Sequence, residues 1–137
     1  MSLTLKPVPL EYAAATWPLV EQMLEEAANF SNGDYNIEQV KLYVNTGAWT
    51  LLVAVDDENM IHGAAAVSFI NYPNSRVAFV TCSGGKGIFN RGVVEQLCAI
   101  AKSMGATKVQ ATSRESVARL LQRAGFDRCA VVLDIKI

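Results

Sequence analysis

The sequence is poor in the residues that bind metals or form disulfide bonds. Its 137 residues include three cysteines and one histidine. The cysteines show no CxxC or CxxH spacing, and their odd number favours free thiols over a disulfide framework: Cys82, Cys98 and Cys129. Because His62 is the single imidazole, a zinc site would need cysteines and carboxylates from distant segments. The sequence therefore predicts a reducing compartment and no metal centre.

Long apolar runs and an excess of one charge are also missing. No segment stays apolar over the roughly 18 residues that a membrane-spanning helix needs, and no leader pattern occurs. Twelve Lys and Arg residues against thirteen Asp and Glu residues give a net charge of -1, so no overall field attracts nucleic acid or anionic lipid. We expect a cytoplasmic protein without a nucleic-acid or membrane partner.

Apolar residues are present in the amount that one core requires. They make up 51% of the chain, and no repeat or linker divides it, so residues 1–137 are expected to form a single domain. Their spacing predicts, in order, a strand over 3–8, helices over 11–30 and 36–46, strands over 49–57, 60–70 and 76–82, a helix over 91–104, a strand over 107–112, a helix over 115–124 and a strand over 129–137. Strands that alternate with helices favour a mixed α/β or α+β sheet with helices packed on it.

Capping residues mark the ends of the predicted helices. Asn36, with Gln39 three residues later, predicts a capping box. Residues 31–33 are expected to end the first helix, and Gly105 the third. Pro18 lacks a backbone N–H, so it either lies in a first turn or kinks a longer helix.

A glycine-rich turn over 83–87 (Ser-Gly-Gly-Lys-Gly) joins the strand over 76–82 to the helix that follows. Backbone N–H groups at such a turn can converge on a pyrophosphate at the positive end of the helix, and glycines let the anion approach closely. Lys86 and Arg91 can add charge-assisted contacts. The same pattern also fits a plain strand-to-helix turn.

Five consecutive segments carry a family resemblance: RVAFVTC, GGKGI, GVVEQLCAIAKSMGA, TKVQAT and SVARLLQRAGFD. Together they resemble the core of the GNAT superfamily, the acyl-CoA-dependent N-acyltransferases. The resemblance implies a mixed, mostly antiparallel central sheet with helices on both faces. It also implies transfer of an acetyl group from acetyl-CoA to an amine, either a small molecule or a protein.

The resemblance implies a cofactor site but no catalytic residue. In the family, the strand before the glycine turn splays from its neighbour so that its backbone can bind pantetheine, and the matching residues are 79–82. The implied cofactor-binding residues are Val80, Thr81, Cys82, Gly84, Gly85, Lys86, Gly87, Ile88, Asn90, Arg91 and Gly92.

Three departures from the family pattern support an alternative function. Ser83 and Gly84 stand where the family's phosphate loop opens with Arg or Gln, and the turn is one residue longer before the helix. Leu121 stands where a tyrosine often protonates the departing thiolate. The alternative is a catalytically inactive GNAT-fold protein used for binding or assembly, such as a phage virion component. Residues 82–85 are also similar to uncharacterised GNAT-like proteins carried by phages.

Other candidate groups have simpler interpretations. Cys82 is either a reactive thiolate or, more commonly for a free cysteine, a small buried side chain. His62 is expected to be a satisfied strand histidine, and without a second histidine Ser83 and Ser113 form no catalytic triad. Glu115 suits the positive end of the last helix better than the role of general base.

Three segments are placed without an assigned role. Glu25 and Glu26 are expected on a solvated face, whereas residues 29–35 can shape the acceptor pocket of the implied fold. The apolar strand over 129–137 can pair with a second copy, which makes a homodimer an expected assembly.

Overall fold

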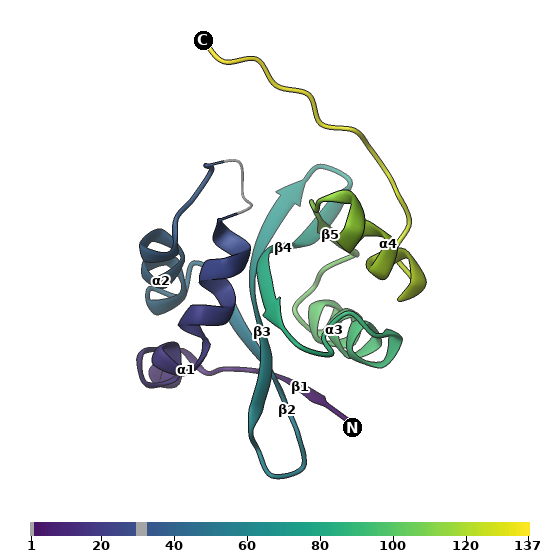
Figure 1. The fold of residues 1–137 in the computed structure, drawn as a ribbon. Coiled ribbons are helices and arrows are strands. Elements are labelled where there is room, and N and C mark those ends of the chain that lie inside the picture. Colours follow the sequence, from purple (N-terminus) through teal and green to yellow (C-terminus); the bar gives the residue numbers. More distant parts are fainter. Residues whose placement is uncertain (1, 30–32) are drawn as a thin grey trace.

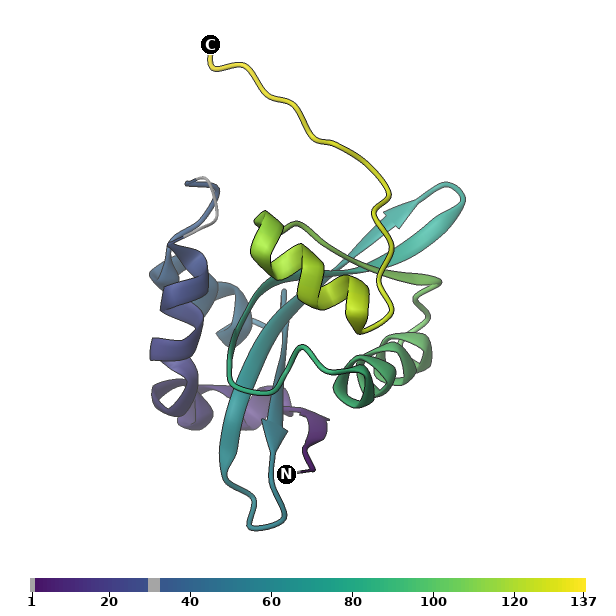
Figure 2. The same cartoon turned by 45° about the vertical axis from the view of Figure 1, so that its right-hand side comes forward.

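The computed structural model describes residues 2–29 and 33–137. Their helices and strands follow one another as β1 (Thr4–Pro7), α1 (Leu10–Ala28), α2 (Ile37–Asn45), β2 (Thr50–Val55), β3 (Ile61–Tyr72), β4 (Ser75–Gly85), α3 (Arg91–Ser103), β5 (Lys108–Ala111) and α4 (Glu115–Arg123). The strands form one sheet in the order β1-β2-β3-β4-β5. Neighbours are antiparallel except for the parallel pair β4 and β5. Helices α1 and α2 cover one face and α3 and α4 the other, which confirms the predicted architecture (Figure 1 and Figure 2).

The interior strand β2 explains why both faces of the sheet are covered. All of its residues from Leu51 to Val55 are buried. Leu51 and Val53 pack in the core under α1 and α2, whereas Leu52 packs in the core that includes α3. A nearly continuous apolar strand is typical of a sheet buried on both sides, because successive side chains point to opposite faces.

Local signals placed the helices correctly. The capping box is present: the Asn36 side chain accepts from the N–H of Gln39 at 3.0 Å, and the Gln39 side chain accepts in return at 2.9 Å. Gly105, at a φ of +86°, follows the end of α3. Pro18 lies inside α1, so the longer helix is the correct alternative. The stop predicted at residues 31–33 lies, apart from Gly33, outside the described residues.

The predicted last strand over 129–137 is wrong. The segment leaves α4 and extends away from the sheet in both views (Figure 1 and Figure 2). The exposed fractions of Val131, Leu133 and Ile135 are 86%, 88% and 87%. Strand propensity is not sufficient here, because a strand forms only where a neighbouring edge accepts its hydrogen bonds. The homodimer stays a prediction.

The strand before the glycine turn is longer than the sequence predicts. Strand β4 continues through Gly85, and Ser83, Gly84 and Gly85 pair with Ala65, Ala64 and Gly63 of β3. The loop proper is therefore limited to residues 86–90. Within the described residues no helix has both the length and the apolar character needed to cross a membrane.

Candidate active site

The site begins where β4 parts from β5. The last residue pair between these strands joins Val80 to Ala111, whereas β4 stays paired with β3 as far as Gly85. From Thr81 onward, β4 therefore has no β5 partner. The sequence predicted a splayed strand over 79–82, and the structure shows the splay from Thr81, since Phe79 and Val80 still pair with β5.

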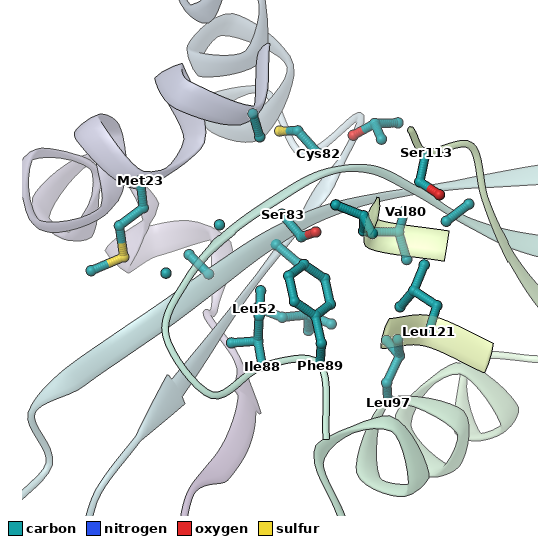
Figure 3. Close-up of a pocket in the computed structure, with 18 of the residues that line it drawn as sticks. Met23, Leu52, Val80, Cys82, Ser83, Ile88, Phe89, Leu97, Ser113 and Leu121 are labelled. Carbon is teal, nitrogen blue, oxygen red and sulfur yellow. The ribbon is translucent and has the colours of Figure 1, made fainter. Parts of the chain in front are cut away.

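A cavity of about 330 Å³ lies at this divergence. Its wall is mostly apolar, and Figure 3 shows Leu97 and Leu121 on one side and Met23 on the other. The polar or ionisable side chains in the wall are those of Glu26, Tyr35, Thr81, Cys82, Ser83, Thr112, Ser113 and Arg114. The volume falls within the ordinary range of small-molecule sites.

A β-bulge shapes the cavity wall at Thr81. Cys82 pairs with Ala66 and Val80 with Val67, so the register shifts by one residue and Thr81 is left over. The Thr81 Oγ1 donates to the carbonyl oxygen of Ala66 at 2.8 Å, and the Tyr35 hydroxyl donates to the carbonyl oxygen of Thr81. The bulge is thus held by its own side chain and by a residue from the connection between α1 and α2.

Two glycines of the predicted phosphate turn are required by packing. A Cβ on Gly84 would lie 2.2 Å from the carbonyl oxygen of Met23, and one on Gly85 would lie 2.3 Å from that of His62. Gly85 also has a φ of +103°, which side chains rarely adopt. Close contact with α1 and β3 is therefore a reason for glycine at both positions, and their part in binding an anion stays a prediction.

The turn and the start of α3 retain donors for an anion. The Lys86 N–H is used by the carbonyl oxygen of His62 at 2.9 Å, and the Asn90 side chain caps α3 by accepting from the Val93 N–H at 2.9 Å. Among the described residues, none accepts from the N–H groups of residues 87–89. The N–H groups of Arg91 and Gly92 belong to a first helical turn and have no partner within the helix.

Burial keeps the two weak acids of the cavity wall neutral. Burial raises the pKa of the Cys82 thiol to about 12, so the buried, unreactive interpretation of this residue is favoured. Burial, together with the nearby Cys82 and Asp34, raises the pKa of Tyr35 to about 12. The Tyr35 phenol therefore remains a hydrogen-bond donor at neutral pH.

Comparison with solved structures connects this geometry to a known fold. A predicted acetyltransferase from Clostridium acetobutylicum, crystallised with acetyl-CoA, matches with a TM-score of 0.68 and 14% identity over 98% of this chain and 96% of that one. The ribosomal-protein-alanine N-acetyltransferase of Brucella melitensis gives 0.69 and 13% over 99% of both chains. An aminoglycoside 6′-N-acetyltransferase from Acinetobacter baumannii gives 0.64 and 17% over 99% of this chain and 98% of that one.

The chain has the GNAT fold. Comparison of the sequence with protein-family models finds no match, and comparison with curated proteins finds none either. The three structures named above come from bacteria, and their descriptions give no support to a phage-borne origin.

The GNAT cofactor residues predicted from the sequence divide into two groups. One group lines the cavity: Val80, Thr81, Cys82, Gly84, Gly85 and Ile88. The other group lies in the turn after β4 or the first turn of α3 and is not part of the cavity wall: Lys86, Gly87, Asn90, Arg91 and Gly92. Arg91 donates from Nη2 to the carbonyl oxygen of Arg123 at 3.3 Å, so it also ties α3 to the end of α4.

Leu121, which the sequence resemblance matches to the family tyrosine, carries no phenol. Leu121 of α4 lines the cavity and points toward Val80 (Figure 3). An apolar side chain there cannot donate a proton to a leaving thiolate. The Tyr35 hydroxyl donates to the Thr81 carbonyl, so protonation of the thiolate is left to solvent or to another polar group of the wall.

Sequence reasoning missed part of the cavity wall. Glu26 was assigned to a solvated face, and it is exposed, but it also lines the cavity. Arg114 and Phe126 received no role and line it as well. Tyr35 lies in the segment expected to shape the pocket. No local pattern could have identified Glu26 or Arg114, because the residues around the cavity come from segments far apart in the chain.

The remaining candidates have structural roles. The His62 Nε2 lies 2.7 Å from Asp56 Oδ2, which fits a satisfied histidine, and His62 is not part of the cavity wall. Both oxygens of Glu115 accept from the Arg128 guanidinium at 2.7 Å. That pairing lowers the pKa of Glu115 and makes it a poor base. The described residues hold no group of three metal-ligating side chains.

Proposed function

We propose that the chain is an N-acetyltransferase that binds acetyl-CoA along the unpaired part of β4 and transfers the acetyl group to an amine. One observation carries the proposal: β4 continues for residues 81–85 after losing β5, and an apolar cavity lies beside this open edge. An open strand edge presents backbone donors and acceptors that an extended amide-containing ligand can pair with. The pantetheine arm of coenzyme A is such a ligand.

The turn and α3 fit the diphosphate of the same ligand. Residues 87–89, 91 and 92 offer N–H groups at the positive end of a helix, where an anion is stabilised. Lys86 is exposed next to them and can add a charge-assisted contact. The donor set therefore suits an anion even though Gly84 and Gly85 are occupied with packing.

The acceptor would approach from the α1 side of the cavity. Glu26 is a carboxylate of the cavity wall near the C-terminal end of α1, where no basic residue balances it within the last turn. A carboxylate and a helix C-terminus both attract an ammonium group. Glu26 can hold an amine and accept its proton, directly or through water.

In direct transfer the protein orients the amine and the thioester and forms no covalent bond to the acetyl group. When bound, acetyl-CoA supplies a thioester that an amine can attack. The amine nitrogen bonds to the acetyl carbon and displaces the thiolate, while its proton passes to Glu26 or water. Holding both partners in attack geometry lowers the entropic barrier, and a β4 N–H directed at the carbonyl oxygen stabilises the developing charge.

Calorimetry and thiol release together test the proposal. We expect coenzyme A to bind with measurable heat, and acetyl-CoA to release free thiol when a suitable amine is added. The amine panel should include aminoglycosides and a peptide with an N-terminal alanine, the acceptors named for two matched proteins. Absence of heat and of thermal stabilisation at millimolar coenzyme A would remove the enzyme interpretation.

Leu121 favours a second candidate, a GNAT-fold protein that binds a ligand without turning it over. The observation is that this position lines the cavity with an apolar side chain. Binding of coenzyme A without thiol release across the amine panel would support this candidate.

A further inference from the structure

The carbonyl group of Thr81 has no partner in the sheet register. In β3, Ala66 pairs with Cys82 and Val67 with Val80, so the register passes over Thr81. On the other side, β5 ends opposite Val80. A partly buried backbone carbonyl that no strand engages needs a donor from elsewhere.

Tyr35 supplies this donor. Its hydroxyl donates to the carbonyl oxygen of Thr81 across 46 positions of sequence. The Tyr35 ring packs edge-on against Trp49, with ring centroids 5.7 Å apart and planes at 81°. The ring centroids of Trp49 and Tyr43 are 4.8 Å apart. The phenol is therefore held by packing and does not rely on its hydrogen bond alone for orientation.

This contact fixes a whole peptide group. The described peptide bonds include no cis bond, so the Thr81 carbonyl and the Cys82 N–H belong to a planar trans unit and point in opposite directions. The Lys86 N–H donates to the His62 carbonyl, and in the alternating antiparallel ladder this directs the Cys82 N–H toward Ala66 of β3. Tyr35 therefore fixes the bulge from the side opposite β3. This peptide also begins the stretch of β4 that β5 no longer accompanies.

We propose that Tyr35 is a positioning residue for acetyl transfer, which holds the Thr81 bulge and thereby sets where the backbone groups of the open β4 edge, from Ser83 onward, stand toward the thioester. The inference rests on the proposed function. Tyr35 lines the same cavity as Glu26. Its hydrogen bond to Thr81 therefore connects the side of the cavity proposed for the amine with the β4 edge proposed for acetyl-CoA. Leu121 is apolar and cannot donate a hydrogen bond to the same carbonyl.

Tyr35→Phe removes the hydroxyl and keeps the ring, with Tyr43→Phe as the matched control. Tyr43 belongs to the same aromatic cluster but does not line the cavity. We expect Tyr35→Phe to lower kcat about tenfold, with less than about threefold change in KM for acetyl-CoA, because one orienting hydrogen bond is lost and the binding surface remains. Tyr43→Phe should leave both parameters within about twofold of the original chain.

Amide NMR of the ligand-free chain gives a readout that does not depend on turnover. Tyr35→Phe should move the signals of Thr81 and Cys82, and Tyr43→Phe should not. Unmoved signals would overturn the assignment whether or not the chain transfers acetyl groups. Moved signals with unchanged kcat would reduce Tyr35 to a structural role and overturn it as well. Absence of transfer by the unaltered chain would instead contradict the proposed function, and with it any role of Tyr35 in transfer.

Discussion

The carbonyl oxygen of His62 lies 2.3 Å from the point where a Cβ on Gly85 would stand. The backbones of β3 and β4 therefore lie too close together at Gly85 to leave room for a side chain. The Lys86 N–H donates to the same His62 oxygen. The glycine turn is thus attached to the sheet before it reaches α3. A substitution at Gly85 therefore tests folding and not ligand binding.

Gly85→Ala is expected to lower the free energy of unfolding by about 2–4 kcal/mol, because it adds both a backbone clash and an unfavourable φ. Gly33→Ala is the matched control, since Gly33 has a φ of +81° with nothing within 4 Å of an added Cβ. It should cost about 1 kcal/mol, the conformational part alone. Urea unfolding measures both. If the two variants lost the same free energy of unfolding, the His62 carbonyl would have to move aside from the added Cβ at little cost.

Gly92 offers a cleaner test of the anion site. Apart from its chain neighbours and the backbone of its own helix, an added Cβ there meets Asn90 Oδ1 at 3.3 Å and no other described atom within 4 Å. Gly92→Asp should support folding, because a carboxylate suits the first turn of a helix, yet weaken coenzyme A binding at least about tenfold by charge repulsion. Gly92→Ala should bind within about threefold of the original chain. Calorimetry compares the two variants, and equal affinities would move the diphosphate away from α3.

Glu26→Gln tests the acceptor side. We expect KM for a cationic amine to rise about three- to fivefold at low salt, because an exposed carboxylate contributes at most about 1 kcal/mol. Glu25→Gln, the exposed neighbour that does not line the cavity, should have little effect. Steady-state kinetics at two salt concentrations distinguishes them. If Glu25→Gln raised KM as much as Glu26→Gln, a general surface field would explain the effect better than a contact.

The turn between β2 and β3 predicts a pH dependence of stability. The hydrogen bond from the His62 side chain, followed by the N–H groups of Met60 and Glu58, lowers the pKa of Asp56 from its ordinary 3.8. A lowered carboxyl pKa contributes stability above the unfolded value, which is lost as pH falls through the folded value.

Asp56→Asn should therefore reduce the loss of stability on acidification below about pH 4, measured by urea unfolding. Asp57→Asn, in the same turn and exposed, is the control. If Asp56→Asn left the loss of stability below about pH 4 unchanged, other carboxylates would cause that loss. Glu115, which is paired with Arg128, is the next candidate.

Features that depend on neighbouring residues in sequence could be predicted, and features that depend on distant ones could not. The capping box of Asn36 and Gln39 is local, and so is the end of α3 at Gly105. The packing role of Gly84 depends on Met23, some sixty positions earlier, so the sequence suggested a ligand role instead. The segment over 129–137 has strand character, but strand formation needs an edge that its sequence does not describe.

The same distinction applies to the site. The order of strand, turn and helix around residues 80–92 indicated a place for acetyl-CoA, because the chain itself brings those residues together. Glu26, Tyr35 and Arg114 reach the cavity from other segments. The segment of Tyr35 was expected to shape a pocket, whereas the places of Glu26 and Arg114 in the wall follow only from the assembled sheet and helical layers.

Amide NMR during a titration with coenzyme A tests the central claim most directly. The account predicts that signals of residues 81–85 and 87–92 move together, with one common dissociation constant. If these signals stayed in place at saturating millimolar ligand, or if the affected residues lay elsewhere, the open edge of β4 would not be a coenzyme A site and the proposed acetyl transfer would be contradicted.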